Sequence, residues 1–145
     1  MNKLPFTKKK IIDLFIKQKK IITSSELIDL QSAEGRFLSE DLNSKINLPP
    51  FNNSAVDGYA LHKQDLKNNK ILYCTRRIAA GDKKNIKIKT GEAVRIFTGA
   101  KMPVNSYTVV MQENTLRKEN NVKLLKAPRF GENSRVQGED IKKNQ

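Results

Sequence analysis

The sequence is poor in the residues that build disulfide frameworks and metal clusters. Its 145 residues include one cysteine, Cys74, one histidine, His62, and no tryptophan. A single cysteine cannot form an internal disulfide, and a single histidine cannot assemble a histidine metal site. These scarcities exclude a disulfide-stapled domain and a cysteine or histidine zinc cluster, and they indicate the reducing environment of the cytoplasm.

Long apolar runs are missing as well. No stretch approaches the roughly 18 consecutive apolar residues that a membrane span needs. The basic start at Lys8, Lys9 and Lys10 leads into segments that keep returning to charge, unlike a targeting segment. We therefore expect no membrane partner. The length predicts one ordinary domain or two small ones.

Negative charge is scarce beside positive charge. The chain has 28 Lys and Arg against 15 Asp and Glu, a formal net charge of +13. Such an excess favours anionic partners, which include nucleic acids, lipid headgroups and phosphorylated small molecules. The lysines are dispersed along the chain instead of gathered into one basic segment. We therefore favour a generic solvated surface over a dedicated nucleic-acid face.

Helical periodicity is confined to the start of the chain. Between Thr7 and Lys20 apolar residues recur with helical spacing among lysines, which predicts an amphipathic helix. Ser24 to Glu26 could cap a second helix, but residues 27–30 alternate too tightly to separate helix from strand. We interpret residues 27–30 as a strand.

The pattern changes after the pair Pro49-Pro50, which blocks both helix and strand ladder and indicates a junction near residues 43–47. Beyond it, short apolar segments alternate with turn residues, which is typical of a β-barrel or sandwich. The expected strands lie at residues 71–73, 86–89, 94–97, 108–111 and 122–125. The fold class is therefore α+β, with an N-terminal amphipathic helix, a small α/β domain and a mainly β, barrel-like second domain.

Three polar segments could carry chemistry. Residues 52–59 gather amides, a hydroxyl and the Asp57 carboxylate around Gly58 in what we expect to be a tight turn, where an ionised carboxylate could bind a metal. Thr98 offers a hydroxyl at a strand end, and Arg135 precedes Glu139 and Asp140. Each segment also has a plain structural interpretation, as a turn or a surface ion pair. Asp57, Asp82 and Asp140 form a cation site only if the fold brings at least two of them together.

Taken in order, these segments resemble the molybdopterin molybdenumtransferase family, which includes the MoeA proteins of bacteria and the E domain of gephyrin. The resemblance covers nearly the whole chain. It rests on the blocks AEGRFLSED (33–41), LPPFNNSAVDGYA (48–60), AAG (79–81), GEAVRIFTGA (91–100), VVMQE (109–113) and Arg135 with GEDI (138–141). An isolated Asp-Gly-Tyr would be a weak motif, whereas the ordered series is specific.

The resemblance implies an enzyme that inserts molybdate into adenylated molybdopterin, with a divalent cation such as Mg²⁺, and that releases AMP and molybdenum cofactor. It implies a homodimer in which residues 1–43 and 141–145 belong to domain I, which carries dimerisation, and residues 44–140 form the cleft-lining domain II. A pterin-binding domain normally follows in the same chain. We expect that residues 1–145 alone do not complete the reaction.

By matched position, the resemblance assigns catalytic roles to Asp57, Thr98 and Asp140. Asp57 and Asp140 would hold the metal, because carboxylates do not bind molybdate or phosphate directly. Thr98 would donate a hydrogen bond, and Ser54 and Arg135 would bind substrate.

The chain departs from the family at Asn52, where an aspartate is usual, and at Val136 and Gln137, where an arginine run is usual. These changes remove one negative and two positive charges and predict weaker anion binding.

Two alternatives remain open. The β domain could bind nucleic acid, with Phe51, Tyr59 and Tyr73 as stacking groups. The chain could instead serve as a dimerisation and scaffolding module.

Overall fold

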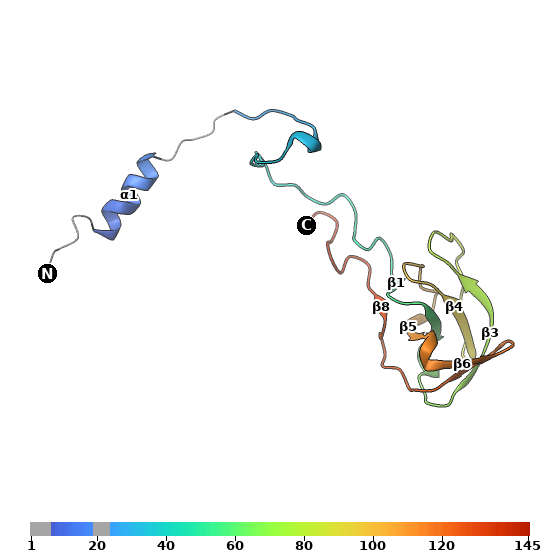
Figure 1. Ribbon diagram of the computed structural model, residues 1–145. Helices are drawn as coiled ribbons and strands as arrows, with labels where there is room; N and C mark the ends of the chain where they lie inside the picture. Colours follow the sequence, from blue (N-terminus) through green and yellow to red (C-terminus); the bar gives the residue numbers. More distant parts are fainter. Residues whose placement is uncertain (1–6, 19–23) are drawn as a thin grey trace. The chain divides into compact units, whose positions relative to one another are not determined.

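A computed structural model describes residues 7–18 and 24–145 of the chain (Figure 1). The chain divides into two units, Met1–Leu42 and Asn43–Gln145. The predicted grouping of residues 141–145 with residues 1–43 stays a prediction. Within the second unit, residues 141–145 bond to its first segment, since the Ser44 amide donates to the Gln145 carbonyl at 2.9 Å.

The first unit contains the predicted helix, α1 (Lys8–Gln18). Its apolar residues recur every three or four positions, as the periodicity requires. No residue described within this unit is buried, and Phe15 and Ile16 on α1 are 73% and 65% exposed. The amphipathic helix is confirmed as far as Gln18, while residues 19 and 20 of the predicted segment lie outside the described residues.

The strand predicted over residues 27–30 is wrong. Residues 24–29 have no regular structure, and a single 3-10 turn, η1 (Leu30–Ser32), follows. Among the residues described in this unit, no segment forms a ladder with residues 27–30, and an unpaired strand leaves its backbone groups without partners. The Glu26 carboxylate, instead of capping a helix, accepts from the Arg36 guanidinium at 2.7 Å.

The second unit is built on one curled six-stranded sheet. Its strands are β2 (Gly58–His62), β3 (Ile71–Ile78), β4 (Glu92–Ile96), β5 (Ser106–Met111), β6 (Thr115–Lys118) and β7 (Asn121–Leu124). They lie in the order β5-β2-β4-β3-β7-β6, and β3 and β4 pair in parallel while the other pairs are antiparallel. The short 3-10 turns η2 (Lys63–Asp65) and η3 (Gln112–Asn114) follow β2 and β5. The predicted α+β class with a mainly β second part is confirmed.

Four of the five expected strands are present, as β3, β4, β5 and β7. Residues 86–89 are the exception, because this segment forms only an isolated bridge between Lys87 and Val104. The prediction also missed β6 and β2, which lies between β5 and β4. Residues 58–62 are almost entirely buried on both faces, so β2 lacks the polar alternation that marks a half-exposed strand.

Apolar side chains pack on both faces of the curled sheet. Alternate residues of β2 and β4 point to opposite faces, which places Leu61 and Ala93 in one cluster and Ala60 and Val94 in the other. The first cluster contains Tyr59, Leu61, Leu72, Cys74, Ala93, Val110, Val122 and Leu124. The second contains Ala60, Ile78, Ile88, Val94, Ile96, Ala100, Met102 and Val109. A sheet covered on both faces holds the loops at its ends in fixed positions.

Gly58 sits where β2 approaches β5 most closely. A Cβ atom at this position would lie 2.0 Å from the Val110 carbonyl oxygen and 3.1 Å from the Met111 Cα. Both are backbone atoms and cannot turn aside. Glycine is therefore required here for close approach, and not for the tight turn expected from the sequence; the bend precedes it, at residues 55–57.

A second, two-stranded sheet joins the first and last segments of this unit. Strand β1 (Asn53–Ser54) pairs antiparallel with β8 (Ser134–Arg135). The pairing continues beyond these strands, since Leu48 bridges Ile141 and the Gly138 amide donates to the Pro49 carbonyl at 2.9 Å. Residues 48–54 and 134–141 thus form an irregular antiparallel ribbon, visible beside the curled sheet in Figure 1.

We expect Gly58→Ala to lower the free energy of unfolding by about 2 kcal/mol or more, because the added methyl group collides with backbone. Urea denaturation measures the change. Gly91→Ala is the control, since Gly91 has positive φ but open space around it, and left-handed strain alone costs roughly 1 kcal/mol. Equal losses in the two variants would contradict the close-approach explanation.

Candidate functional site

Asp57 and Thr98 form a direct pair. Asp57 lies in the bend that leads into β2, and Thr98 follows β4. One oxygen of the Asp57 carboxylate, Oδ1, accepts from the Thr98 backbone N–H and from the Thr98 hydroxyl, both at 2.8 Å. These bonds, with a smaller contribution from the charge of Arg95, hold the pKa of Asp57 below its ordinary value of 3.8. Asp57 is therefore an exposed carboxylate, fixed through one oxygen.

Arg95 braces the segments around this pair. Its guanidinium donates to the Gly58 carbonyl at 2.9 Å and to the side-chain carbonyl of Gln112. The same group lies over two rings, 5.3 Å from the centroid of Tyr59 and 4.6 Å from that of Phe97. The Gln112 amide in turn donates to the Asp57 carbonyl at 3.2 Å. One side chain thus links the residues that precede Thr98 with those that follow Asp57.

Arg135 and Asp140 form a second cluster. The Arg135 guanidinium contacts Asp140 and also bonds to Glu139, with 2.8 Å between Nε and Oε1. Glu139 also accepts from the Val136 amide at 2.8 Å. The Arg135 contact and the amide lower the pKa of Glu139, and the two carboxylates raise that of Arg135. The guanidinium of Arg135 is therefore engaged within its own loop.

Strand β1 lies between the two clusters. On one side the Gly99 amide donates to the Ser54 carbonyl at 2.9 Å, beside Thr98. On the other side Asn53 pairs with Arg135. The Ser54 side chain is buried and donates to the Val56 carbonyl at 2.6 Å, so its hydroxyl shapes the bend before Asp57. Its predicted role in substrate binding stays a prediction.

The sequence-predicted residues are thus brought together as two pairs. Within residues 7–18 and 24–145, no hydrogen bond or ion pair joins Asp57 to Asp140, and no three acidic, histidine or cysteine side chains gather into a metal cluster. The ribbon register places Asp140 opposite the start of the 48–54 segment and Arg135 opposite Asn53 near its end. Joint metal binding by Asp57 and Asp140 stays a prediction. Asp82 instead closes its own turn, where its carboxylate accepts from the Ala79 amide at 3.0 Å.

Two of the departures seen in the sequence contact each other. The side-chain carbonyl of Asn52 accepts from the Gln137 backbone amide at 2.8 Å, and the Gln137 side chain donates to the Pro50 carbonyl at 2.8 Å. These uncharged side chains join the two segments of the ribbon between the Asn53–Arg135 pair and the Leu48–Ile141 bridge. Val136 is 60% exposed.

The aromatic residues proposed for stacking on nucleic acid are not equally available. Tyr59 is 5% exposed and packs in the first core cluster, so it cannot stack on a base. Phe51 and Tyr73 are 37% and 53% exposed. Cys74 is buried, and burial raises the pKa of its thiol, which makes a nucleophilic role unsuited to it.

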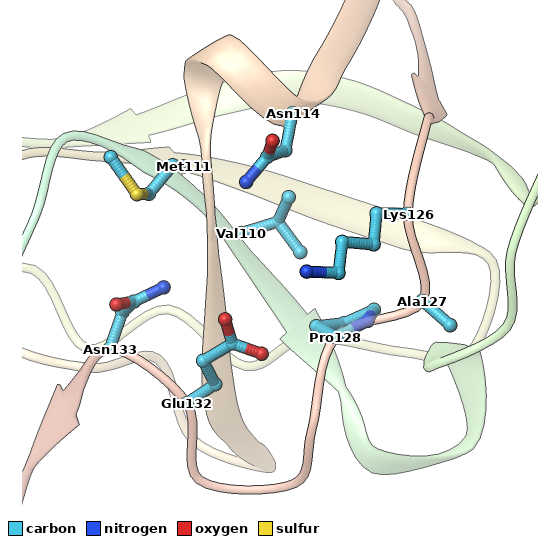
Figure 2. Close-up of a pocket in the computed structure, with 8 residues that line it drawn as sticks. All are labelled: Val110, Met111, Asn114, Lys126, Ala127, Pro128, Glu132 and Asn133. Carbon is cyan, nitrogen blue, oxygen red and sulfur yellow. The ribbon is translucent and has the colours of Figure 1, made fainter.

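A shallow pocket lies over β5 and the loop that follows β7 (Figure 2). Val110 and Met111 form its floor, and polar groups of Asn114, Lys126 and Glu132 are directed toward it. Its empty space is about 230 Å³ and includes open solvent. Ligand pockets for drug-sized molecules are about 300–1,000 Å³. This hollow is therefore too small to enclose a nucleotide or a pterin.

Comparison with known proteins relates the chain to one family. Residues 7–145 match the family described as the MoeA N-terminal region, domains I and II. A molybdopterin molybdenumtransferase from Nostoc sp. is 41% identical over 74% of this chain and 26% of its own length. One from Haemophilus influenzae is 38% identical over 83% of this chain and 30% of its own length. The crystal structure of a molybdopterin biosynthesis moeA protein from Pyrococcus horikoshii superposes with a TM-score of 0.77 at 32% identity, over 83% of this chain and 33% of that one.

The chain therefore spans about a quarter to a third of the length of these relatives. In the part of the chain that the structure describes, no helix is long and apolar enough to cross a membrane.

We expect the titration of Asp57 to report its bonds to Thr98. A lowered folded pKa means that the contribution of these bonds to stability is present above pH 3.8 and is lost as the pH falls through the lower folded value. Thr98→Val removes the hydroxyl but keeps the backbone N–H, so the pKa of Asp57 should rise part of the way to 3.8. NMR of the carboxyl carbon measures it. Thr90→Val, which removes a hydroxyl bonded to Gln64, is the control, and an unchanged Asp57 pKa in Thr98→Val would contradict the assignment.

Proposed function

The chain belongs to the family of the MoeA N-terminal region, and from this membership we propose that it supplies the cleft-lining part of an enzyme that inserts molybdate into adenylated molybdopterin, with release of AMP. The observation that carries the proposal is the Asp57 carboxylate, fixed by Thr98 through one oxygen and exposed to solvent. Because the chain covers only part of its relatives, the reaction is proposed for the cleft that these residues line together with a pterin-binding domain.

The chemistry requires that anions be held near a carboxylate. Molybdate and the phosphate linkage of the adenylated substrate are negatively charged, so Asp57 cannot bind them directly. Its other oxygen, Oδ2, has no hydrogen-bond or ion-pair partner among the described residues. A carboxylate oxygen of this kind suits a hard divalent cation such as Mg²⁺, which is often held by one or two carboxylates plus substrate phosphates and waters.

When bound, Mg²⁺ would supply Lewis-acid polarisation of the phosphate linkage to AMP. The residues of this chain would determine the position of the cation. Thr98 prevents the Asp57 carboxylate from rotating, and Arg95 holds the backbone on either side of it. Preorganised groups of this kind need little rearrangement when charge develops on the leaving phosphate. Asp140 and Arg135, which form an ion pair within the ribbon, are proposed as a second contribution to the same cleft.

We also propose a homodimer that forms through the first unit, and a cytoplasmic location. The support for the dimer is the exposed apolar face of α1, because its apolar side chains are not buried by the described residues of their own unit and such side chains favour burial against another surface. A scaffolding role follows from the same face and needs no separate site.

The decisive variant is Asp57→Ala. We expect a chimera in which this chain replaces the matching segment of the Haemophilus influenzae relative to restore molybdenum-cofactor-dependent enzyme activity in a bacterial strain that lacks its own molybdenumtransferase. The same chimera with Asp57→Ala should reduce the restored activity by at least about a hundredfold, because the proposed cation loses its ligand.

Asp82→Ala is the matched control for that experiment. It removes one carboxylate from an exposed loop of the same unit but leaves Asp57 and Thr98 untouched, so activity should remain within about twofold of the parent chimera. Full activity in the Asp57→Ala chimera, with normal protein level, would remove Asp57 from the mechanism.

For the dimer, we expect light scattering to show a dimer of this chain at micromolar concentration, and Phe15→Glu to shift it toward monomer by placing a charge on the apolar face of α1. Lys17→Gln makes the same change in net charge on the opposite face of the helix and should leave the dimer unchanged. A wild-type chain that is monomeric at every concentration tested contradicts the proposed dimer.

A further inference from the structure

Two arginines lie side by side next to Thr98. Arg77 on β3 and Arg95 on β4 are direct partners in the parallel ladder, so both side chains leave the same face of the sheet. Both guanidinium groups lie over one ring, 5.6 Å and 4.6 Å from the centroid of Phe97. Phe97 immediately precedes Thr98, so the arginine pair borders the Asp57–Thr98 site.

No carboxylate is bonded to either arginine of this pair in the described residues. Like charges directly opposite each other on adjacent strands are destabilising. The neighbouring Arg76 is neutralised by Glu92, with 2.6 Å between Nη2 and Oε2. Arg77 has neither a hydrogen bond nor an ion pair within residues 7–18 and 24–145, and Arg95 donates only to uncharged carbonyl groups. The two cations therefore share the Phe97 ring without a bonded carboxylate.

The arrangement suits an incoming anion. A guanidinium presents donors in a planar fork that matches the oxygens of a phosphate group, and stacking on an aromatic ring fixes the plane of that fork. Arg77 is exposed, so a ligand can reach it, whereas Arg95 is half-buried and held by Gly58 and Gln112. An anion bound between the two guanidinium groups would be attracted to both and would reduce the repulsion between them.

We propose that Arg77 and Arg95 form a binding site for a diphosphate-type anion. If the proposed function holds, the ligand is the phosphate linkage of the adenylated substrate, which would then lie beside Asp57. The site is separate from Arg135, whose guanidinium is already bonded to Glu139 and Asp140. Sequence reasoning gave Arg135 the anion-binding role and gave Arg77 and Arg95 none.

Inorganic pyrophosphate is the probe, added to the 145-residue chain at low ionic strength and followed by isothermal titration calorimetry. We expect saturable binding that Arg77→Gln weakens about tenfold or more, because a charge-assisted, forked contact is lost. Arg77→Lys keeps the charge but not the fork and should fall between the two. Arg129→Gln, which removes an equal charge from an exposed loop, should change binding by less than about twofold.

Three results would overturn the proposal. The first is no saturable binding of pyrophosphate by the wild-type chain. The second is equal weakening in Arg77→Gln and Arg129→Gln, which would reduce the effect to net charge. The third is that a single-stranded oligonucleotide binds more tightly than pyrophosphate and depends equally on Arg77, which would assign the arginines to nucleic acid.

The proposal and the proposed function can fail separately. Pyrophosphate binding requires no molybdenum insertion. Loss of binding in Arg77→Gln beside an active Asp57→Ala chimera would support the anion site and contradict the role of Asp57. Wild-type affinity in Arg77→Gln beside an inactive Asp57→Ala chimera would contradict the anion site alone.

Discussion

The close approach of β2 to β5 at Gly58 is the constraint on which the site depends. The space between Gly58 and the Val110 carbonyl leaves no room for a side chain, and this contact fixes where β2 begins. Asp57 immediately precedes Gly58, so the same contact fixes the position of the Asp57 backbone. The Gly58 carbonyl then accepts from Arg95, and the Asp57 carbonyl accepts from Gln112. The contacts that pack β2 in the sheet therefore also fix the geometry of the site.

The electrostatics of this region follow from that packing. The Arg95 guanidinium lies over the rings of Tyr59, a member of the first core cluster, and of Phe97. Its charge acts on Asp57 and lies opposite that of Arg77. The result is a carboxylate within reach of the charge of Arg95, with the second guanidinium, that of Arg77, over the same Phe97 ring as Arg95. The proposed divalent cation suits the carboxylate, and the proposed phosphate group suits the two arginines.

Alternation along the sequence predicted β3, and its absence explains why β2 was missed. Residues 71–78 alternate between exposed and buried positions, whereas β2 is buried on both faces and has no alternation to detect. Residues 86–89 do alternate, but they meet only Val104 and cannot extend a ladder. The contact between Asp57 and Thr98 could not be predicted from local sequence patterns, because the two residues are 41 positions apart. The resemblance to a family pointed to both residues separately but not to their contact, and only the ladder register could place Arg77 against Arg95.

The antiparallel ribbon has a consequence for the architecture of longer relatives. The Ser44 amide donates to the Gln145 carbonyl, and the Asn144 amide donates to the Ser44 carbonyl. The first and last segments of the unit therefore lie side by side. A lobe with adjoining ends can be inserted into a host domain without separating the host's own segments. Because the two end segments are hydrogen-bonded to each other, any reorientation of such a lobe would require both segments to bend together.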